Sequence, residues 1–525
     1  MCVLFKLLFV TIGGVSIEIH AASHVCQTIV IESAENAVKP AAIFQSHMVL
    51  QQNTPINIWG RASQGSSVTI SLDNDKRIVS ADKSGKWMVT FPQRVASSNP
   101  IQLKINELVF EDILVGEVWL CSGQSNMVRN LKEAEGGVDA IDKYKGNQIR
   151  LFRYEHIPLV AKKGYSPQEL ARCNVSDFFE ATWTLNTPEN AAKFSSVAWM
   201  FGNVIAENLQ VPVGIIQLAV GGSAINNWIS PERLKAEPVS ATLFTHDWLT
   251  SADVDMGHRN RCKEAFQPVL VSGQPYIIGN TPYRWMCEPG FLFEAGIEPI
   301  KHFRFKGVVW YQGETDAITE GSVKRYETFL PLLISDWRAN FQNVQLPFIL
   351  VQLPRYNKST WPALREIQRR TQQLVLDSYL TVTIDLGEEQ DIHPRDKLPI
   401  GFRSAILALV NIYRSKTQTT VFPAIDDIYA ENTSLIVAFR DTICVGDKFN
   451  IPGFEVAYTN NQFGGAQAYY IDEKHIGLKI TQKPVSLRYG WQAFPKPVLE
   501  IVSTSGFPLG PFTFKNIKTF KNNKL

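Results

Sequence analysis

Ser125 stands in the segment CSGQSNM, directly after an apolar run, where a catalytic nucleophile could be placed. The run over residues 113–121 is typical of a buried strand, and it stops abruptly at small polar residues. Ligands usually bind at the carboxyl edge of a parallel sheet, where such a strand would end. Ser125 could equally cap a following helix, the usual role of a serine after a strand. The segment alone leaves both interpretations open.

His393 is a candidate for the base that such a serine would need. It is the only histidine between His302 and His475, and it follows another apolar run in the segment DIHP. An imidazole accepts a proton near neutral pH, and a carboxylate is then needed to fix its tautomer. Asp391, two residues earlier, is the nearest carboxylate. A histidine-proline surface turn is the alternative interpretation of this segment.

Two further polar loops follow apolar runs. The first is Gly221-Gly222-Ser223, and the second spans residues 312–316 with the sequence QGETD. A carbonyl attacked by a serine needs hydrogen-bond donors for its developing oxyanion, and glycine-rich loops offer free backbone N–H groups. The N–H groups of Gly222 and Ser125 are therefore candidate donors. A plain turn at the glycines and helix-capping acids in QGETD are the alternatives.

The elements expected to position these loops form an alternating pattern. Apolar runs predict strands at 113–121, 213–220, 307–311, 346–352 and 379–385. Helical periodicity is found at 198–209, 323–341, 362–377 and 400–414. Strands that alternate with helices predict a parallel sheet covered on both faces. We therefore expect an α/β domain with three flavodoxin-like layers and a parallel five-stranded sheet, which brings the polar loops to one edge.

The regions on either side of this pattern are rich in short alternating runs, which predict β-sandwich-like domains. The expected organisation is a signal peptide at 1–22, an N-terminal β domain at 23–112, the α/β domain at 113–417 with an insertion at about 230–300, and a C-terminal β domain at 418–525.

The composition narrows the range of functions. A formal net charge of +2 over 525 residues gives no electrostatic case for binding nucleic acid. The chain contains no HExxH motif, and no GxGxxG or GxxxxGK[ST] motif follows a strand, so we expect neither a metal nor a nucleotide cofactor. After the leader, no apolar stretch is long enough for a transmembrane helix.

Several features favour export. Lys6 precedes an apolar stretch that ends in small residues, which resembles a secretory signal peptide. Glycosylation sequons begin at Asn174, Asn357 and Asn432. Without Cys2 the chain keeps six cysteines, enough for three disulfides of undetermined pairing. We therefore expect a secreted or lysosomal protein.

Four segments carry a family resemblance: GEVWLCSGQSNM, AVGGSAINNW, FKGVVWYQGETDA and DLGEEQDIHPRDKLPIGFR. In this order they resemble the motif blocks of the sialate O-acetylesterases, members of the SGNH hydrolase superfamily. Flanking β segments such as MVLQQNTPINIWGRA and VSLRYGW also resemble this family. The resemblance implies an SGNH hydrolase fold and a serine esterase that hydrolyses O-acetyl esters through an acetyl-enzyme, without a metal or cofactor.

Carried over to this sequence, the family's nucleophile falls on Ser125, its base on His393 and its acid on Asp391. Glu314 is the alternative carboxylate partner of the histidine.

The same resemblance places the oxyanion donors on the N–H groups of Ser125 and Gly222. The wider superfamily adds an asparagine amide, but this chain has no asparagine in the QGETD block. The Gln312 amide is our replacement, because an ionised Asp316 could not donate a hydrogen bond.

The resemblance implies O-acetylated sialic acid or a sialoglycoconjugate as the substrate. Arg129 could bind the carboxylate of an acidic sugar, although an exposed helix arginine is the alternative. Two other functions stay open. One is an acetyl esterase that acts on another carbohydrate such as acetylxylan. The other is a non-catalytic carbohydrate-binding protein on a hydrolase fold.

Overall fold

The computed structural model describes residues 10–12, 15–17, 38–144, 146, 148–245, 254–271, 283–415, 421–459, 462–515 and 517–519. Most of the predicted signal peptide lies outside these residues. Of that segment the structure describes the paired strands β1 (Val10–Ile12) and β2 (Val15–Ile17). Among the described helices, none has the length and apolar character needed to span a membrane.

One long strand, β10 (Leu108–Gly123), links the first β region to the central sheet. Residues 108–112 are exposed or half-buried and lie in the part that pairs with β9, whereas residues 113–123 are buried throughout and continue into the part that pairs with strands of the central sheet. The predicted boundary between residues 112 and 113 therefore falls inside a continuous strand. The other strands of this region are β3 (Lys39–Pro40), β4 (Val49–Gln51), β5 (Ile56–Arg61), β6 (Ser67–Leu72), β7 (Asp75–Ser80), β8 (Lys86–Phe91) and β9 (Ser97–Ile105).

The central sheet has the strand order β12-β11-β13-β10-β14-β15-β16. All five predicted strands are present as adjacent parallel neighbours: β10, β13 (Val213–Ala219), β14 (Gly307–Tyr311), β15 (Phe348–Val351) and β16 (Ser378–Thr381). The predicted number of five strands is wrong, because β11 (Ile149–His156) adds a sixth parallel strand and β12 (Phe179–Leu185) an antiparallel edge. The sequence of β11, IRLFRYEH, alternates polar with apolar residues and so lacks the continuous apolar run of an inner strand.

Two pairs of helices cover this sheet: α5 (Ser196–Leu209) packs with α12 (Leu398–Asn411), and α10 (Glu320–Asn340) packs with α11 (Trp361–Leu374). The indole of Trp119 meets Phe201 of α5, and the indole of Trp310 meets Trp337 of α10. Trp310 lies in register with Ser122, an odd number of residues from Trp119, so the two indoles point to opposite faces. The helices therefore form the two outer layers of a three-layer domain.

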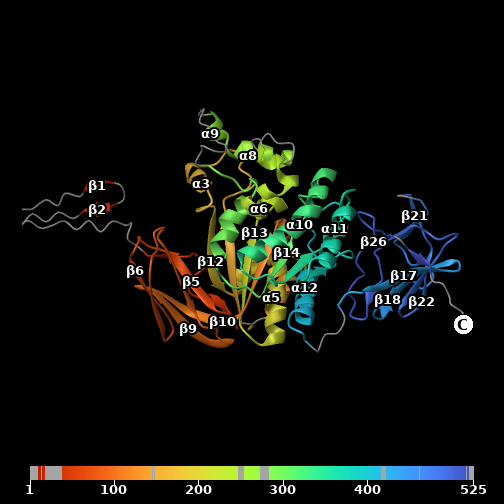
Figure 1. Ribbon diagram of the computed structural model, residues 1–525, viewed down its shortest axis with the longest axis horizontal. Helices are drawn as coiled ribbons and strands as arrows, with labels where there is room; N and C mark the ends of the chain where they lie inside the picture. Colours follow the sequence, from red (N-terminus) through yellow and green to blue (C-terminus); the bar gives the residue numbers. More distant parts are fainter. Residues whose placement is uncertain are drawn as a thin grey trace, which may run out of the picture.

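The short helices of the predicted insertion lie above the central sheet in Figure 1, where α8 and α9 are labelled. Their bounds are η3 (Ile225–Trp228), α6 (Pro231–Ala236), η4 (Pro238–Ser240), α7 (Thr242–Thr245), α8 (Met256–Ala265), α9 (Gln267–Val271), η5 (Phe293–Ile297) and η6 (Glu298–Ile300). The remaining helices are α1 (Ser125–Val128), η2 (Leu131–Glu133), α2 (Gly137–Lys143), α3 (Pro167–Ala171) and α4 (Pro188–Lys193).

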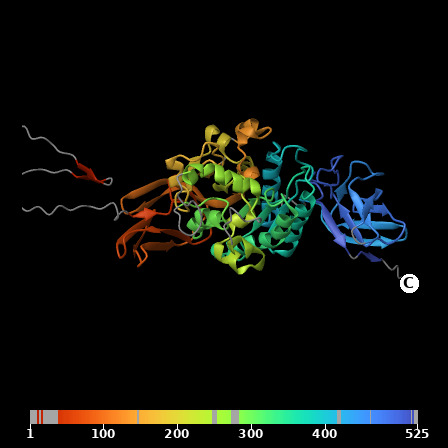
Figure 2. The ribbon, with the colours of Figure 1, turned by 90° about the horizontal axis from the view of Figure 1, so that it is seen from above.

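The C-terminal region is all β in its described part, and it lies at the end of the molecule opposite the first β region (Figures 1 and 2). The guanidinium of Arg365, on α11, donates to the carbonyls of Gln492 and Ala493 and so ties this region to the central domain. Its strands are β17 (Ile425–Glu431), β18 (Ser434–Phe439), β19 (Ile443–Cys444), β20 (Phe454–Ala457), β21 (Phe463–Gly465), β22 (Ala468–Asp472), β23 (His475–Lys479), β24 (Ser486–Tyr489), β25 (Val502–Ser503), β26 (Phe512–Lys515) and β27 (Lys518–Thr519).

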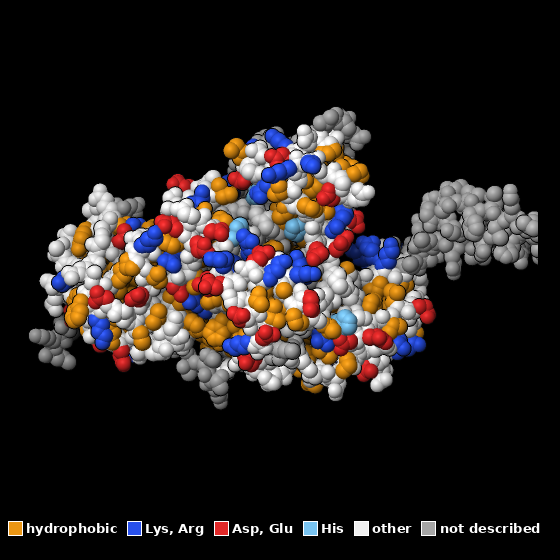
Figure 3. Space-filling model, turned by 180° about the vertical axis from the view of Figure 1, so that it is seen from behind, with side chains coloured by type: hydrophobic (Ala, Val, Ile, Leu, Met, Phe, Trp, Pro, Cys, Tyr) orange, Lys and Arg blue, Asp and Glu red, His pale blue; other side chains and the backbone are white. Residues whose placement is uncertain are grey.

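The surface and the thiols bear on the expectation of export. Lys and Arg side chains are interspersed with Asp and Glu side chains on the face shown in Figure 3. Asn357 and Asn432 are exposed, whereas Asn174 is half-buried and its amide donates to the Ala171 carbonyl. Cys121, Cys173 and Cys287 are buried thiols and Cys444 is an exposed one, whereas Cys26 lies outside the described residues.

Candidate active site

The turn after β10 fixes the position of Ser125. Gly123 has a φ of 139°, and a Cβ there would lie 2.0 Å from the Tyr311 carbonyl oxygen, so the turn requires glycine. Helix α1 begins at Ser125, while Gln124 occupies the N-cap position without a side-chain capping bond. The alternative that Ser125 caps a helix is therefore wrong, and its hydroxyl is free for another partner.

That partner is His393. The Ser125 Oγ and His393 Nε2 atoms are 2.9 Å apart, although 268 residues separate them in the sequence. Burial lowers the pKa of His393 below the usual imidazole value; the positive charges of Arg129 and Lys397 act in the same direction, and Asp391 opposes them. A neutral imidazole next to a serine hydroxyl can accept its proton, which is the first requirement for a nucleophilic serine.

Asp391 lies next to the imidazole but is not hydrogen-bonded to it. The distance from Asp391 Oδ1 to His393 Nδ1 is 3.9 Å, longer than a hydrogen bond. The same carboxylate oxygen instead accepts the backbone N–H of His393 at 2.8 Å. The Asp391 side chain is 51% exposed. The carboxylate therefore shapes the histidine loop and faces the ring at longer range.

Glu314, the alternative carboxylate, lies behind the nucleophile. It is fully buried, and its Oε1 accepts a hydrogen bond from Asn126 Nδ2. Burial raises the pKa of Glu314 to about 7, and the bond from Asn126 and the charge of Lys397 act against this rise. Its bonding partner is thus the residue after the nucleophile and not the histidine ring.

The Gln312 amide has a different role from the predicted one. Its Nε2 lies within hydrogen-bond distance of three acceptors: Gln124 Oε1 at 3.2 Å, the Ser223 carbonyl at 3.1 Å and Asp316 Oδ2 at 2.6 Å. An amide nitrogen has only two hydrogens, so none is left for an oxyanion. The prediction of Gln312 as the third oxyanion donor does not fit this geometry. The amide instead connects its own loop, after β14, to the loops after β10 and β13.

The glycine pair lies directly against the nucleophile. A Cβ on Gly221 would lie 3.6 Å from Ser125 Cβ, and Gly222 has a φ of 69° that favours glycine. A Cβ on Gly222 would lie 3.4 Å from His258 Nε2 and 3.5 Å from the Arg261 guanidinium. The insertion helix α8 thus supplies two basic side chains to the turn that holds the predicted oxyanion donor.

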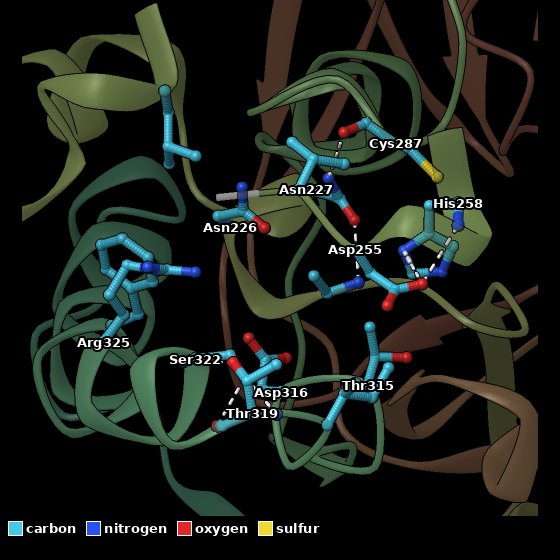
Figure 4. Close-up of a pocket in the computed structure, with 15 residues that line it drawn as sticks. Asn226, Asn227, Asp255, His258, Cys287, Thr315, Asp316, Thr319, Ser322 and Arg325 are labelled. Atoms are coloured by element: carbon cyan, nitrogen blue, oxygen red, sulfur yellow. Dashed lines mark hydrogen bonds and ion pairs between the residues drawn. The ribbon is translucent and has the colours of Figure 1, made fainter. Parts of the chain in front are cut away.

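A cavity lies beside this turn, between the loop after β13, the loop after β14 and α8 (Figure 4). Asn226, Asp255, Thr315 and Arg325 are among its lining residues. The cavity adjoins the nucleophile loop, because the Thr315 N–H donates to Gln124 Oε1 at 3.2 Å. Amide, carboxylate and hydroxyl side chains line the cavity, and neither Ser125 nor His393 is among its lining residues.

Known proteins resemble this chain over most of its length. A mouse (Mus musculus) protein named sialate O-acetylesterase is 28% identical, and the alignment covers 92% of this chain and 95% of the relative. The human (Homo sapiens) sialate O-acetylesterase is 26% identical, with 87% and 88% covered. A family model described as carbohydrate esterase, sialic acid-specific acetylesterase matches residues 271–396.

The chain is a homologue of the sialate O-acetylesterases, and it is an esterase. The interpretation as a non-catalytic binding protein is therefore set aside. A solved structure supports the same relationship: a carbohydrate acetylesterase from Xanthomonas citri has a TM-score of 0.71 and 26% identity, and the match covers 91% of this chain and 100% of that one.

Two residues of this candidate site could not be identified from the sequence. Asn126 directly follows Ser125 within GQSNM, and the sequence indicated a role only for the serine. Lys397 lies four residues after His393, and a lysine at such a place is usually exposed to solvent. Its burial arises from the packing of three loops, for which the sequence carries no local signal.

Proposed function

We propose that this esterase hydrolyses O-acetyl esters of sialic acids through a Ser125 acetyl-enzyme. The 2.9 Å contact between Ser125 Oγ and His393 Nε2 carries the proposal for the chemistry. The names of the mouse and human relatives and of the matching family model support the substrate.

In the first half-reaction, His393 accepts the Ser125 proton as the hydroxyl oxygen attacks the acetyl carbonyl. The backbone N–H groups of Ser125 and Gly222 stabilise the oxyanion, and the nearby Asp391 carboxylate favours the imidazolium. The sugar oxygen leaves with the proton from His393, so an acetyl-enzyme and a free sugar hydroxyl are formed. Water, deprotonated by His393, then hydrolyses the acetyl-enzyme and releases acetate.

The cavity beside Gly222 is our candidate for the space that receives the sugar, because it adjoins both the nucleophile loop and the predicted oxyanion turn. An acetyl esterase for another carbohydrate is the second candidate function. The Xanthomonas citri structure, described as a carbohydrate acetylesterase, favours this broader class.

Turnover by Ser125→Ala tests the chemistry. The variant should retain at most ~10⁻³ of the wild-type turnover of p-nitrophenyl acetate. Ser122→Ala is the matched control, since the buried Ser122 hydroxyl has no hydrogen-bond partner among the residues that the structure describes. Near-normal turnover by a folded Ser125→Ala protein would contradict the proposal.

A substrate panel tests the sugar. Wild-type enzyme should release acetate faster from O-acetylated sialic acid than from acetylated xylan, at equal concentrations of ester. The reverse order would favour the second candidate function while leaving the serine chemistry intact.

The proposal extends to location: an exported protein, secreted or lysosomal, glycosylated at the exposed Asn357 and Asn432. Expression in eukaryotic cells followed by glycosidase treatment should increase the electrophoretic mobility of the wild type but not of an Asn357→Gln/Asn432→Gln/Asn174→Gln variant. An unglycosylated wild-type protein would contradict this part.

A further inference from the structure

The side chain of Asn126 connects three loops. Its Nδ2 donates to Glu314 Oε1 and, at 3.0 Å, to the carbonyl oxygen of Ile392, the residue before His393. Its Oδ1 accepts a hydrogen bond from Lys397 Nζ at 2.6 Å. Asn126 itself is fully buried. The residue after the nucleophile therefore holds the residue before the base through a direct bond.

Two charged groups fix the orientation of this amide. Lys397 is 1% exposed and Glu314 is 2% exposed, so both are nearly inaccessible to water. Burial lowers the pKa of Lys397 to about 7 and raises that of Glu314 to about 7, and each charge favours the charged form of the other. While both groups are charged, the ammonium can only donate and the carboxylate only accept, so the amide of Asn126 cannot flip without losing both bonds.

We propose that Lys397 and Glu314 are positioning residues for catalysis: they fix the Asn126 amide, and this amide holds the His393 loop against the Ser125 loop. The inference rests on the proposed function, because it requires that Ser125 and His393 react together. Neither positioning residue is bonded to the reacting hydroxyl: both act through Asn126, and Lys397 also acts on the imidazole through its charge.

The charge of Lys397 also affects the pKa of His393 directly. The groups that face His393 are Arg129 from the segment after α1, Asp391 from its own loop and Lys397 at the start of α12. Glu314 is bonded to Asn126 Nδ2 and Lys397 to Asn126 Oδ1, and Lys397 is among the groups that lower the pKa of His393. Lys397 thus lowers the pKa of His393 and keeps the imidazole in its neutral, basic form near pH 7.

The test is Lys397→Met, assayed with p-nitrophenyl acetate over a range of pH. Loss of the amide's fixed orientation should lower kcat roughly 100-fold, while KM stays within about 2-fold of the wild-type value. Loss of the ammonium should also move the acid limb of kcat/KM to higher pH by about 0.5 unit, because the pKa of His393 rises.

A second variant covers a failure to fold. Lys397→Met leaves the Glu314 carboxylate buried without its cation, whereas Lys397→Met/Glu314→Gln removes both charges and keeps an oxygen acceptor for Asn126 Nδ2. The double variant should fold and show the same loss of kcat and the same shift of the limb. Arg370→Met is the control, since it removes one positive charge from an exposed pair with Glu327.

A folded single or double variant with unchanged kcat and an unchanged acid limb would overturn the positioning role. Ser125→Ala in the same assay separates this outcome from a failure of the proposed function. An inactive Ser125→Ala with an unaffected Lys397 variant contradicts only the positioning role, and an active Ser125→Ala contradicts the proposed function itself.

Discussion

The loop after β14 and the loop after β16 each bring a carboxylate to the same edge of the sheet, but they hold it in opposite ways. Glu314 is fully buried and bonded to Asn126, whereas the Asp391 side chain is 51% exposed and bonded to the backbone N–H of His393. Asp391 is next to the imidazole in sequence and space, yet Glu314 is the one fixed by its surroundings. The carboxylate nearer to the base is thus in the loop after β16, and the carboxylate that is fixed by its surroundings is in the loop after β14.

This difference has a physical reason. The loop after β14 leaves a central strand, and its buried Gln312 and Glu314 side chains are bonded to the loops after β10 and β13. The loop after β16 leaves the edge of the sheet, and the bidentate contact of Arg403 with Asp385 anchors its first part. Its far part, with Asp391, is open to water. The Asp391 carboxylate is therefore held only by the bond from its own loop, whereas the Ile392 carbonyl beside the base is bonded to Asn126 on the nucleophile side.

The largest effect should follow from removal of the base. His393→Ala should lower the kcat of p-nitrophenyl acetate hydrolysis at least ~10³-fold, because Ser125 Oγ loses the group that accepts its proton. His475→Ala, a change to an exposed histidine of the C-terminal β region, is the matched control. Equal activity of the two variants would remove His393 from the mechanism.

The next effect concerns stability and compares the two carboxylates directly. Glu314→Gln leaves the buried Lys397 without its anion and should lower the free energy of unfolding by about 3 kcal/mol. Asp391→Asn, at an exposed position, should change it by less than about 0.5 kcal/mol. Urea denaturation of both variants measures the difference. Equal destabilisation would contradict the contrast between the loops.

Asp391→Asn should have a moderate effect on catalysis. Its carboxylate is 3.9 Å from Nδ1, so we expect roughly a 10-fold loss of kcat from weaker stabilisation of the imidazolium. A carboxylate hydrogen-bonded to the ring would cost about 10⁴-fold on conversion to an amide. A loss of that size would show that Asp391 moves into contact with the ring during turnover.

The smallest effect should come from Arg129. Activity is lost as the pH falls through the pKa of His393, and this pKa is lowered, so the acid limb of kcat/KM should lie below pH 6.5. Arg129→Met removes a charge that lowers this pKa, and the limb should move to higher pH by less than about one unit, because Glu133 already pairs with Arg129. A shift to lower pH would contradict the charge arrangement.

The fully buried strands of the central sheet could be predicted from the sequence. Five strands of the central sheet have continuous apolar runs, and Ser125 and His393 follow two of these runs, so their meeting at one edge could be inferred. Strand β11 was missed because its half-buried position gives a mixed pattern.

The role predicted for Gln312 and the burial of Lys397 could not be predicted, because both depend on where individual side chains point. The turn at Gly313, with a φ of 147°, directs the Gln312 amide to the neighbouring loops and away from a free donor position. Lys397 has a charged side chain, which predicts exposure, but it is buried and donates to Asn126, 271 residues away in the sequence. Sequence patterns report the average environment of a residue type and not such individual contacts.

Labelling with a fluorophosphonate tests the central claim most directly, that His393 activates Ser125 as the nucleophile. After proteolysis, mass spectrometry should find the adduct on Ser125 in the wild-type protein, with loss of esterase activity in step with labelling. His393→Ala should label far more slowly. Inactivation without an adduct on Ser125, or an adduct on another serine that accounts for the lost activity, would contradict the account.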